Sequence, residues 1–160
     1  MQIITAFPFA VEQEADLRIP LSDGITLSAR VWRPVGAGPV PVILEYLPYR
    51  KRDGTAARDA GTHPYLAGHG YVCVRVDMRG CGESEGLFED EYSEQELADG
   101  VEVVNWLSKQ EWCSGNVGMM GISWGGFNGL QIAALAPEPL KAVISLCSSV
   151  DRFADDIHYK

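Results

Sequence analysis

The segment NVGMMGISWGG, residues 116–126, gives the clearest indication of the fold of this 160-residue chain. Its first part is an apolar segment typical of a buried strand, and its second part opens a helical pattern that continues to Leu135. Between the two lies Gly121-Ile122-Ser123-Trp124-Gly125, which matches the pattern G-x-S-x-G. Glycines two residues before and after Ser123 permit a turn that would be too tight for residues with a Cβ atom. We therefore predict a strand, a sharp turn and a helix, with Ser123 on the turn.

Two interpretations of Ser123 are open at this point. In the first, Ser123 is a nucleophile exposed at the edge of a sheet, and the N–H of Trp124 at the start of the helix faces the oxyanion that forms. In the second, Ser123 is only the N-cap of a helix that follows a glycine-rich turn. The pattern alone is frequent by chance, but its place between a strand and a helix favours the first.

Strands and helices alternate along the rest of the chain. The Ser22-Asp23-Gly24 turn joins the first two strands into an antiparallel hairpin. Ser93 and Glu96 form a capping box at the start of the second helix, whereas Gly61 and Pro64 weaken the first. The predicted strands cover residues 17–21, 25–32, 42–47, 71–76, 117–122 and 142–146, and the predicted helices cover residues 56–67, 93–109 and 124–135.

The last four strands are apolar on both faces, which is typical of parallel strands covered by helices on both sides. The chain therefore has an α/β fold, predicted as one domain over residues 1–160 with an open, doubly wound, mostly parallel sheet and an antiparallel start. Sheets of this kind bind ligands beyond the carboxyl ends of their strands. Functional residues are expected just after Leu47, Val76, Ile122 and Leu146.

The charge and hydropathy of the chain limit the classes of partner that we expect it to bind. The net charge is −9, so the chain has no basic surface with which to replace phosphate counterions, and we expect no nucleic-acid partner. The short basic run Arg50-Lys51-Arg52 is interpreted as a solvated loop. No segment approaches the roughly 20 apolar residues that span a bilayer, so we expect no membrane partner. The first residues make a poor signal peptide, and the expected location is the cytoplasm.

The four cysteines show no metal-binding or redox spacing. Cys73 and Cys147 lie in apolar runs and are predicted to be buried thiols. The glycine-rich segment 118–126 lacks the lysine of a phosphate loop. We therefore expect no cofactor and no metal.

Several stretches, in order along the chain, resemble the CocE/NonD family of α/β-hydrolases, which groups cocaine esterase, X-Pro dipeptidyl-peptidases and α-amino acid ester hydrolases. The resemblance covers nearly the whole chain. It rests on residues 22–27 and 31–34 in the hairpin, on Pro48-Tyr49, on residues 77–86 (DMRGCGESEG) and on residues 111–118 (EWCSGNVG), together with the G-x-S-x-G match.

The resemblance implies an α/β-hydrolase fold, truncated before its last strands, and serine-dependent cleavage of esters or of amides at a peptide N-terminus. Ser123 is then the nucleophile, and the Tyr49 hydroxyl and the N–H of Trp124 form the oxyanion hole. We expect the segment from Asp77 to Gly86 to be structural, with Arg79 and Glu83 paired.

A base and an acid that orients it should follow Ser123 in this fold. His63 and His69 precede it, and no strand separates His158 from the nearby acidic residues, so none of the three is a good base. Asp155 and Asp156 resemble instead an acidic stretch of α-amino acid ester hydrolases, which implies that one of them binds a substrate ammonium group. The alternative is that both are exposed residues at the entry to a cap helix.

Three hypotheses follow from the sequence. The first is a serine hydrolase acting on a small ester or peptide through an acyl-enzyme, with the triad Asp and His absent from residues 1–160. The second is a truncated or degenerate chain without activity. The third is an acyltransferase that uses the same serine. As a fragment the chain should be nearly inactive and, with an unpaired edge strand, prone to aggregate. The residues leave the substrate and the oligomeric state open.

Overall fold

The computed structural model of the chain describes residues 6–155. These residues contain a six-stranded sheet in the order β1-β2-β4-β3-β5-β6. β2 is antiparallel to β1 and β4, whereas β4, β3, β5 and β6 are mutually parallel. The predicted mostly parallel sheet with an antiparallel start is confirmed. The strands are β1 (Val11–Pro20), β2 (Thr26–Pro34), β3 (Val40–Leu47), β4 (Val72–Asp77), β5 (Cys113–Ile122) and β6 (Leu140–Leu146).

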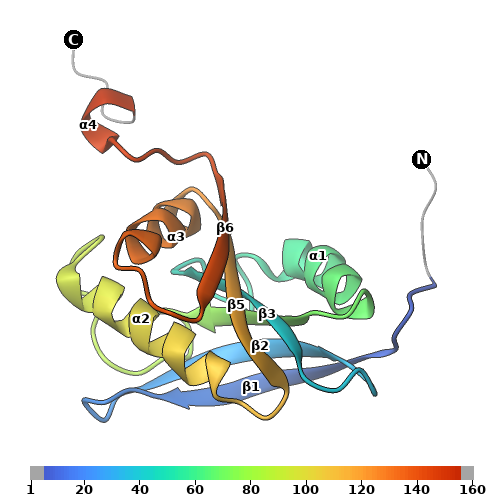
Figure 1. Ribbon diagram of the computed structural model, residues 1–160. Helices are drawn as coiled ribbons and strands as arrows, with labels where there is room; N and C mark the ends of the chain where they lie inside the picture. The colour runs from blue at the N-terminus through green and yellow to red at the C-terminus, as the bar shows by residue number, and fades with distance from the viewer. Residues whose placement is uncertain (1–5, 156–160) are drawn as a thin grey trace.

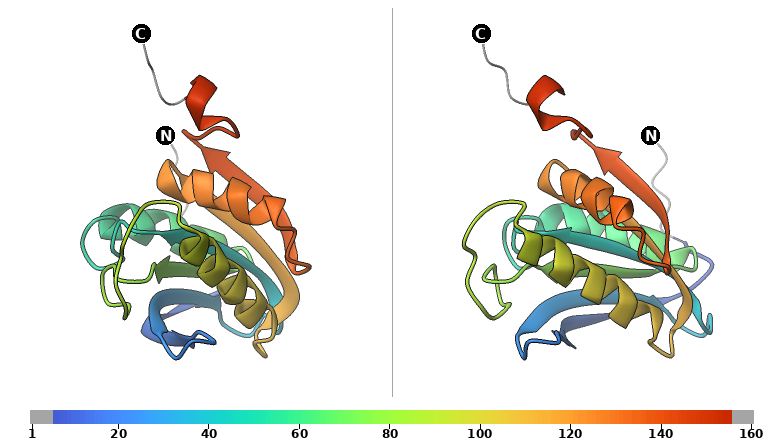
Figure 2. Two further views of the ribbon diagram at one scale, coloured as in Figure 1. Left: turned by 90° about the vertical axis from the view of Figure 1, so that its left-hand side faces the viewer. Right: turned by 60° about the vertical axis from the view of Figure 1, so that its left-hand side comes forward.

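Helices cover both faces of this sheet, as Figures 1 and 2 show. α2 and α3 pack on one face and α1 packs on the other, against β2 and β4. α1 forms in full although Pro64 lies inside it, and its buried residues include His63 and Ala67. None of the helices within residues 6–155 combines the length and the apolar character needed to cross a membrane. The helices are α1 (Ala56–Gly68), α2 (Glu94–Ser108), α3 (Trp124–Ala134) and the short α4 (Arg152–Asp155).

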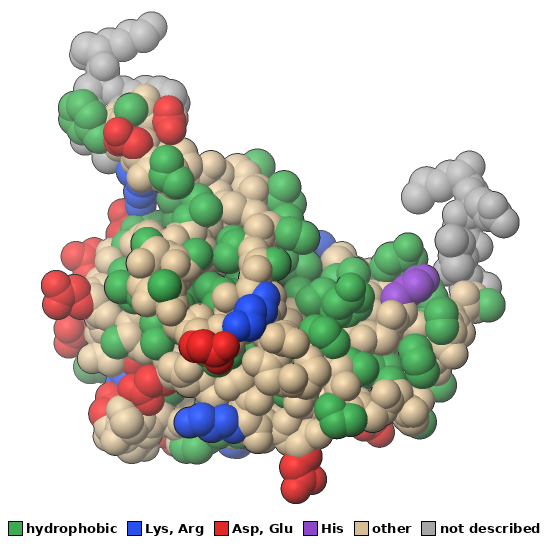
Figure 3. All heavy atoms as spheres, in the orientation of Figure 1, with side chains coloured by type: hydrophobic (Ala, Val, Ile, Leu, Met, Phe, Trp, Pro, Cys, Tyr) green, Lys and Arg blue, Asp and Glu red, His purple; other side chains and the backbone are tan. Residues whose placement is uncertain are grey.

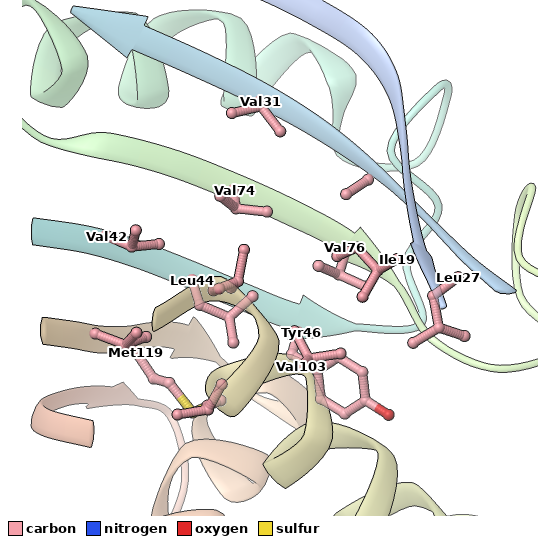
Figure 4. Packing of buried hydrophobic residues seen from close by; sticks show 14 of the residues in the cluster. Ile19, Leu27, Val31, Val42, Leu44, Tyr46, Val74, Val76, Val103 and Met119 are labelled. Atoms are coloured by element: carbon pink, nitrogen blue, oxygen red, sulfur yellow. The ribbon is translucent and has the colours of Figure 1, made fainter. Parts of the chain in front are cut away.

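The main core lies between the sheet and α2 (Figure 4). Alternate residues of β3, Leu44 and Tyr46, are fully buried there beside Val74 of β4 and Val103 of α2. The Tyr46 hydroxyl donates a 3.0 Å hydrogen bond to the carbonyl oxygen of Glu96. Tyr46 therefore fixes the first turn of α2 relative to the strand that leads into the candidate site.

β6 differs from the other parallel strands because its side chains alternate between partly buried and exposed. The prediction that it is covered on both faces is wrong: Ile144 and Leu146 are 60% and 55% exposed. Hydrophobic side chains gather on the face between β6 and α1 (Figure 3). Cys147, at the end of β6, is exposed rather than buried, whereas Cys73 in the central β4 is buried as predicted. The reason is position, since β6 is the last strand of the described sheet.

The loops that follow the parallel strands meet at one edge of the sheet. The Lys51 N–H, beyond β3, donates a 2.7 Å hydrogen bond to Asp77 at the end of β4. The Ser123 N–H, beyond β5, donates a 2.8 Å bond to the carbonyl oxygen of Leu146 in β6. The carboxyl edge of the sheet thus assembles the segments that the sequence singled out.

Candidate active site

Ser123 lies on a strained turn between β5 and α3, which we call the elbow (residues 121–125). Its backbone angles are φ 55° and ψ −117°, outside the regions that residues with a Cβ atom ordinarily occupy. Although Ser123 is the N-cap residue of α3, its hydroxyl makes no capping hydrogen bond. The interpretation of Ser123 as a simple helix cap is therefore not supported, and the hydroxyl remains available at the edge of the sheet.

The glycines of the elbow have the steric role that the sequence predicted. A Cβ atom on Gly121 would lie 2.3 Å from the backbone carbon of Gly125. A Cβ atom on Gly126 would lie 2.5 Å from Ser148 Oγ and 2.9 Å from the carbonyl oxygen of Leu146. The strand and the helix can therefore approach this closely only because these positions carry no side chain.

The Trp124 N–H and the Tyr49 hydroxyl lie side by side next to the elbow. The N–H donates to the phenol oxygen across 3.4 Å, which is long for a hydrogen bond of this type. Two donors at this separation can both reach a single oxygen atom placed between them. The structure thus brings Ser123, Trp124 and Tyr49 together, as the sequence predicted.

Tyr49 belongs to a segment that we call the Tyr49 loop (residues 48–54). Gly54 lets this loop close on itself, because a Cβ atom there would lie 1.9 Å from the carbonyl oxygen of Tyr49. Lys51 is fully buried, and its ammonium group is paired with Glu83 and, at 3.8 Å, with Asp77. The interpretation of the whole basic run as a solvated loop is therefore wrong for Lys51, since its buried charge is compensated by the partly exposed Glu83 and the buried Asp77.

The segment from Asp77 to Gly86 makes structural contacts, but not the predicted pair of Arg79 with Glu83. Arg79 Nε lies 2.7 Å from an Asp99 carboxylate oxygen of α2, and Arg79 Nη2 lies 2.8 Å from the Asp23 carboxylate of the hairpin turn. These bonds raise the pKa of the Arg79 guanidinium. Glu83 turns instead to Lys51 and Arg52. The pairing prediction fails because the two side chains leave the loop toward different elements.

Glu96 is a residue of the site that the sequence did not reveal. Its carboxylate is buried, and one oxygen accepts a 2.7 Å hydrogen bond from the Trp124 indole N–H. The other oxygen accepts a 2.8 Å bond from the backbone N–H of Tyr92. Half of the predicted capping box is present, since Ser93 Oγ accepts a bond from the Glu96 N–H, whereas the Glu96 side chain is used elsewhere. Burial raises the pKa of the Glu96 carboxyl, and the hydrogen bond from Trp124 opposes that rise.

Aromatic rings line the side of the elbow that faces α2. Tyr92 stacks on Trp124 with ring centroids 4.9 Å apart, and Phe88 lies 5.7 Å from the same ring. The guanidinium of Arg152, in α4, lies over Tyr92 at 4.5 Å and over Phe127 at 4.7 Å. The Arg152 side chain therefore reaches from the exposed α4 to the rings beside the elbow.

The other polar residues named from the sequence have different positions. His63 is buried beneath α1, stacked on Trp32 at 4.6 Å, and His69 is exposed at the end of that helix. Their ring nitrogens lie against the carbonyl oxygens of Asp59 and Tyr65 within α1, and within the described residues neither histidine bonds to the elbow. Asp155 is exposed in α4, three residues after Arg152. Asp156 and His158 lie outside the described residues.

Three possible metal ligands lie close together between α1 and the sheet: Glu45 of β3, and Asp59 and His63 of α1. Their ligand atoms all lie within 4.8 Å of one another. Two guanidinium groups already compensate these carboxylates: Arg58 lies 2.6 Å from Glu45 and 2.8 Å from Asp59, and Arg75 lies 3.5 Å from Asp59. Burial raises the pKa of Glu45 to about 7. Since the charges balance within the protein, we assign no metal to this group.

A mixed sheet in this strand order, with helices on both faces and a strained strand-to-helix turn at its carboxyl edge, defines an α/β hydrolase. The chain matches the X-Pro dipeptidyl-peptidase (S15) family over residues 23–160. The chain belongs to this family, and the resemblance noted from its sequence is confirmed.

Individual relatives agree with the family. The chain is 35% identical over 140 residues to a cocaine esterase of Rhodococcus sp., a match that covers 87% of this chain and 24% of the relative. A CocE/NonD family hydrolase from Staphylococcus aureus has a similar structure, with a TM-score of 0.70, 29% identity and coverage of 82% of this chain and 27% of that one. An α-amino acid ester hydrolase aligns with a TM-score of 0.66 at 25% identity, over 89% of this chain and 26% of that one. The chain thus spans about a quarter of the length of these relatives.

Proposed function

We propose that this chain supplies the nucleophile and the oxyanion hole of a serine hydrolase that cleaves ester bonds or N-terminal peptide bonds of the X-Pro type. The observation that carries the proposal is the elbow itself. Ser123 has a left-handed φ of 55° and an uncommitted hydroxyl, and two hydrogen-bond donors lie together beside it. Membership of a family that contains esterases and dipeptidyl-peptidases supports the same class of reaction.

In the proposed reaction, Ser123 Oγ attacks the substrate carbonyl carbon while a base takes the hydroxyl proton. The C=O bond becomes a C–O⁻ single bond, and this oxyanion accepts hydrogen bonds from the Trp124 N–H and the Tyr49 hydroxyl. When the carbonyl re-forms, the alcohol or amine leaves with the proton and the acyl group stays on Ser123. A water molecule then attacks the acyl-enzyme by the same route and releases the acid.

We place the base and its acidic partner outside residues 1–160. Within the described residues, His63 is enclosed between α1 and the sheet and His69 is exposed at the far end of α1, so neither is positioned to take the Ser123 proton. The greater length of the relatives leaves ample chain for both groups. On this proposal, residues 1–160 are the N-terminal part of one hydrolase domain.

We extend the proposal to the substrate through α4. The Arg152 side chain reaches from this short helix to the aromatic rings beside the elbow, and Asp155 follows three residues later, which supports a role near the site. An exposed carboxylate there can pair with a substrate ammonium group. The same role is proposed for Asp156, which lies outside the described residues.

The test is covalent labelling of the full-length protein that carries these residues by a fluorophosphonate, which phosphonylates an activated serine. We expect labelling of the unaltered protein at Ser123 and none of Ser123→Ala. The matched control is Ser114→Ala, because Ser114 is exposed in β5 and should not affect labelling. Labelling that persists in Ser123→Ala, or its absence from the folded full-length protein, contradicts the proposal. Residues 1–160 alone should retain only about 10³–10⁴-fold catalysis over water, from the oxyanion hole and binding.

A further inference from the structure

The Glu96 carboxylate is committed to two donors beside the elbow. The Glu96 residue is only 5% exposed. Its two oxygens accept the Trp124 indole N–H at 2.7 Å and the Tyr92 backbone N–H at 2.8 Å. Burial of a carboxylate costs free energy unless its oxygens accept hydrogen bonds, so Glu96 depends on these donors as they depend on it.

What these bonds hold is Trp124, from two directions. The indole is fixed at its N–H end by Glu96 itself. Its face is covered by the ring of Tyr92, at 4.9 Å between centroids and 26° between planes. Tyr92 has a positive φ of 54°, and the Glu96 bond to its backbone N–H secures that unusual conformation. Glu96 therefore fixes both the indole and the ring that packs against it.

The indole is joined through the Trp124 Cα atom to the backbone N–H beside the Tyr49 hydroxyl, so a displacement of the side chain that turns the residue also turns this donor. Trp124 is the first residue of α3, directly after the strained Ser123, so the usual hydrogen bonds of a helix interior do not hold its N–H. The contact from this N–H to the Tyr49 hydroxyl is long, at 3.4 Å. A small rotation of Trp124 would therefore move one donor away from the point that both donors can reach.

We propose that Glu96 is a positioning residue for the oxyanion hole, acting through the Trp124 indole. This rests on the proposed function. Both Glu96 oxygens receive N–H groups, so the position requires an acceptor on each side. A glutamine has one acceptor and one NH₂ group, and it opposes one of the two donors. Glu96→Gln thus changes the hydrogen bonding with little change in volume.

The first experiment compares Glu96→Gln with the unaltered full-length protein in phosphonylation rate and in steady-state ester hydrolysis. We expect the phosphonylation rate and kcat to fall about tenfold to 100-fold, because a misdirected donor stabilises the oxyanion of the transition state less well. KM should change less than about twofold, because the substrate pocket is unaltered. Glu94→Gln, in the same helical turn but exposed, is the matched control and should leave both rates unchanged.

The second experiment tests whether Glu96 acts through the indole. Trp124→Phe keeps the backbone N–H and removes the indole N–H, so it should lower kcat to a similar extent. In that background Glu96→Gln should add less than about twofold, because the connection is already broken.

Equal effects of Glu96→Gln in both backgrounds overturn the proposal, as does a normal rate for Glu96→Gln. If Glu96→Gln does not fold, a normal kcat for Trp124→Phe overturns it. Failure of the unaltered protein to label at Ser123 is a different result, which contradicts the proposed function itself.

Discussion

The elbow is shaped by the close approach of its own backbone, whereas the Tyr49 loop is held by acidic side chains around the buried Lys51. At the elbow, a Cβ atom on Gly121 would collide with Gly125, and the Ser123 N–H is bonded to β6. In the Tyr49 loop, the Lys51 ammonium is buried among Glu83 and Asp77. The two donors lie 3.4 Å apart, but different physical forces bring them there.

The two donors are therefore sensitive to different kinds of substitution. The elbow depends on the absence of side chains, so any added atom displaces it. The Tyr49 loop depends on compensation of the buried Lys51 charge, so it is damaged by removing a charge rather than by adding volume. Three variants of the full-length protein test this contrast, in decreasing order of expected effect on the phosphonylation of Ser123.

Gly121→Ala should have the largest effect. The new methyl group would lie 2.3 Å from the Gly125 backbone, which cannot move without displacing Ser123 and Trp124 together. We expect phosphonylation to fall by at least about a thousandfold, and the free energy of unfolding to fall by about 3 kcal/mol. The control is Gly61→Ala in α1, where a Cβ atom meets nothing within 4 Å. That variant should be more stable by about 1 kcal/mol, measured by urea unfolding. A normal labelling rate for Gly121→Ala would show that the close approach at the elbow is dispensable.

Tyr49→Phe removes one oxyanion donor and leaves the packing of its loop intact. Loss of a single donor should slow phosphonylation about 100-fold, with no change in the urea midpoint beyond about 0.5 kcal/mol in stability. Tyr65→Phe provides the comparison, because Tyr65 is 45% exposed in α1 and remote from the elbow. If both tyrosine variants label at the same rate, Tyr49 is not a donor.

Lys51→Met should lower stability more than labelling. Removing the buried cation leaves the buried Asp77 carboxylate with its backbone hydrogen bonds but without the ammonium group that compensates its charge, at a cost of about 3 kcal/mol in the free energy of unfolding. Because Lys51 lies two residues after Tyr49, a small shift of the loop should slow phosphonylation about tenfold. Arg50→Met is matched to it, since Arg50 is 61% exposed and its pair with Asp53 should contribute under about 1 kcal/mol. Equal stability of the two variants would mean that the loop does not depend on its buried charge.

Local sequence patterns predicted the parts of the molecule that local physics determines. The G-x-S-x-G motif predicted the turn at Ser123, because the need for glycine on both sides is set within five residues. The mostly parallel sheet with its antiparallel start, and the position of the site at the carboxyl edge, followed from the alternation of elements. Tyr49 required a resemblance to a known family in addition, because no local rule distinguishes an oxyanion tyrosine from a buried one.

Long-range pairs were not predictable from the same patterns. Lys51 lies between two arginines that are exposed, and nothing in the run shows that its side chain meets Glu83, which is 32 residues later. Glu96 fitted a capping box so well that its bond to Trp124, 28 residues away, had no separate signal. β6 has the apolar pattern of a covered strand, but exposure depends on its neighbours and not on its own residues.

The positive φ of Ser123 also has a consequence for how this protein can change. Such a conformation costs a residue with a Cβ atom about 1–3 kcal/mol, and glycine would be relieved of that cost. Replacement of Ser123 by glycine should therefore abolish the proposed chemistry and at the same time raise the melting temperature. Selection for thermostability alone would favour loss of the Ser123 hydroxyl. The hydroxyl is therefore kept only under selection for catalytic activity.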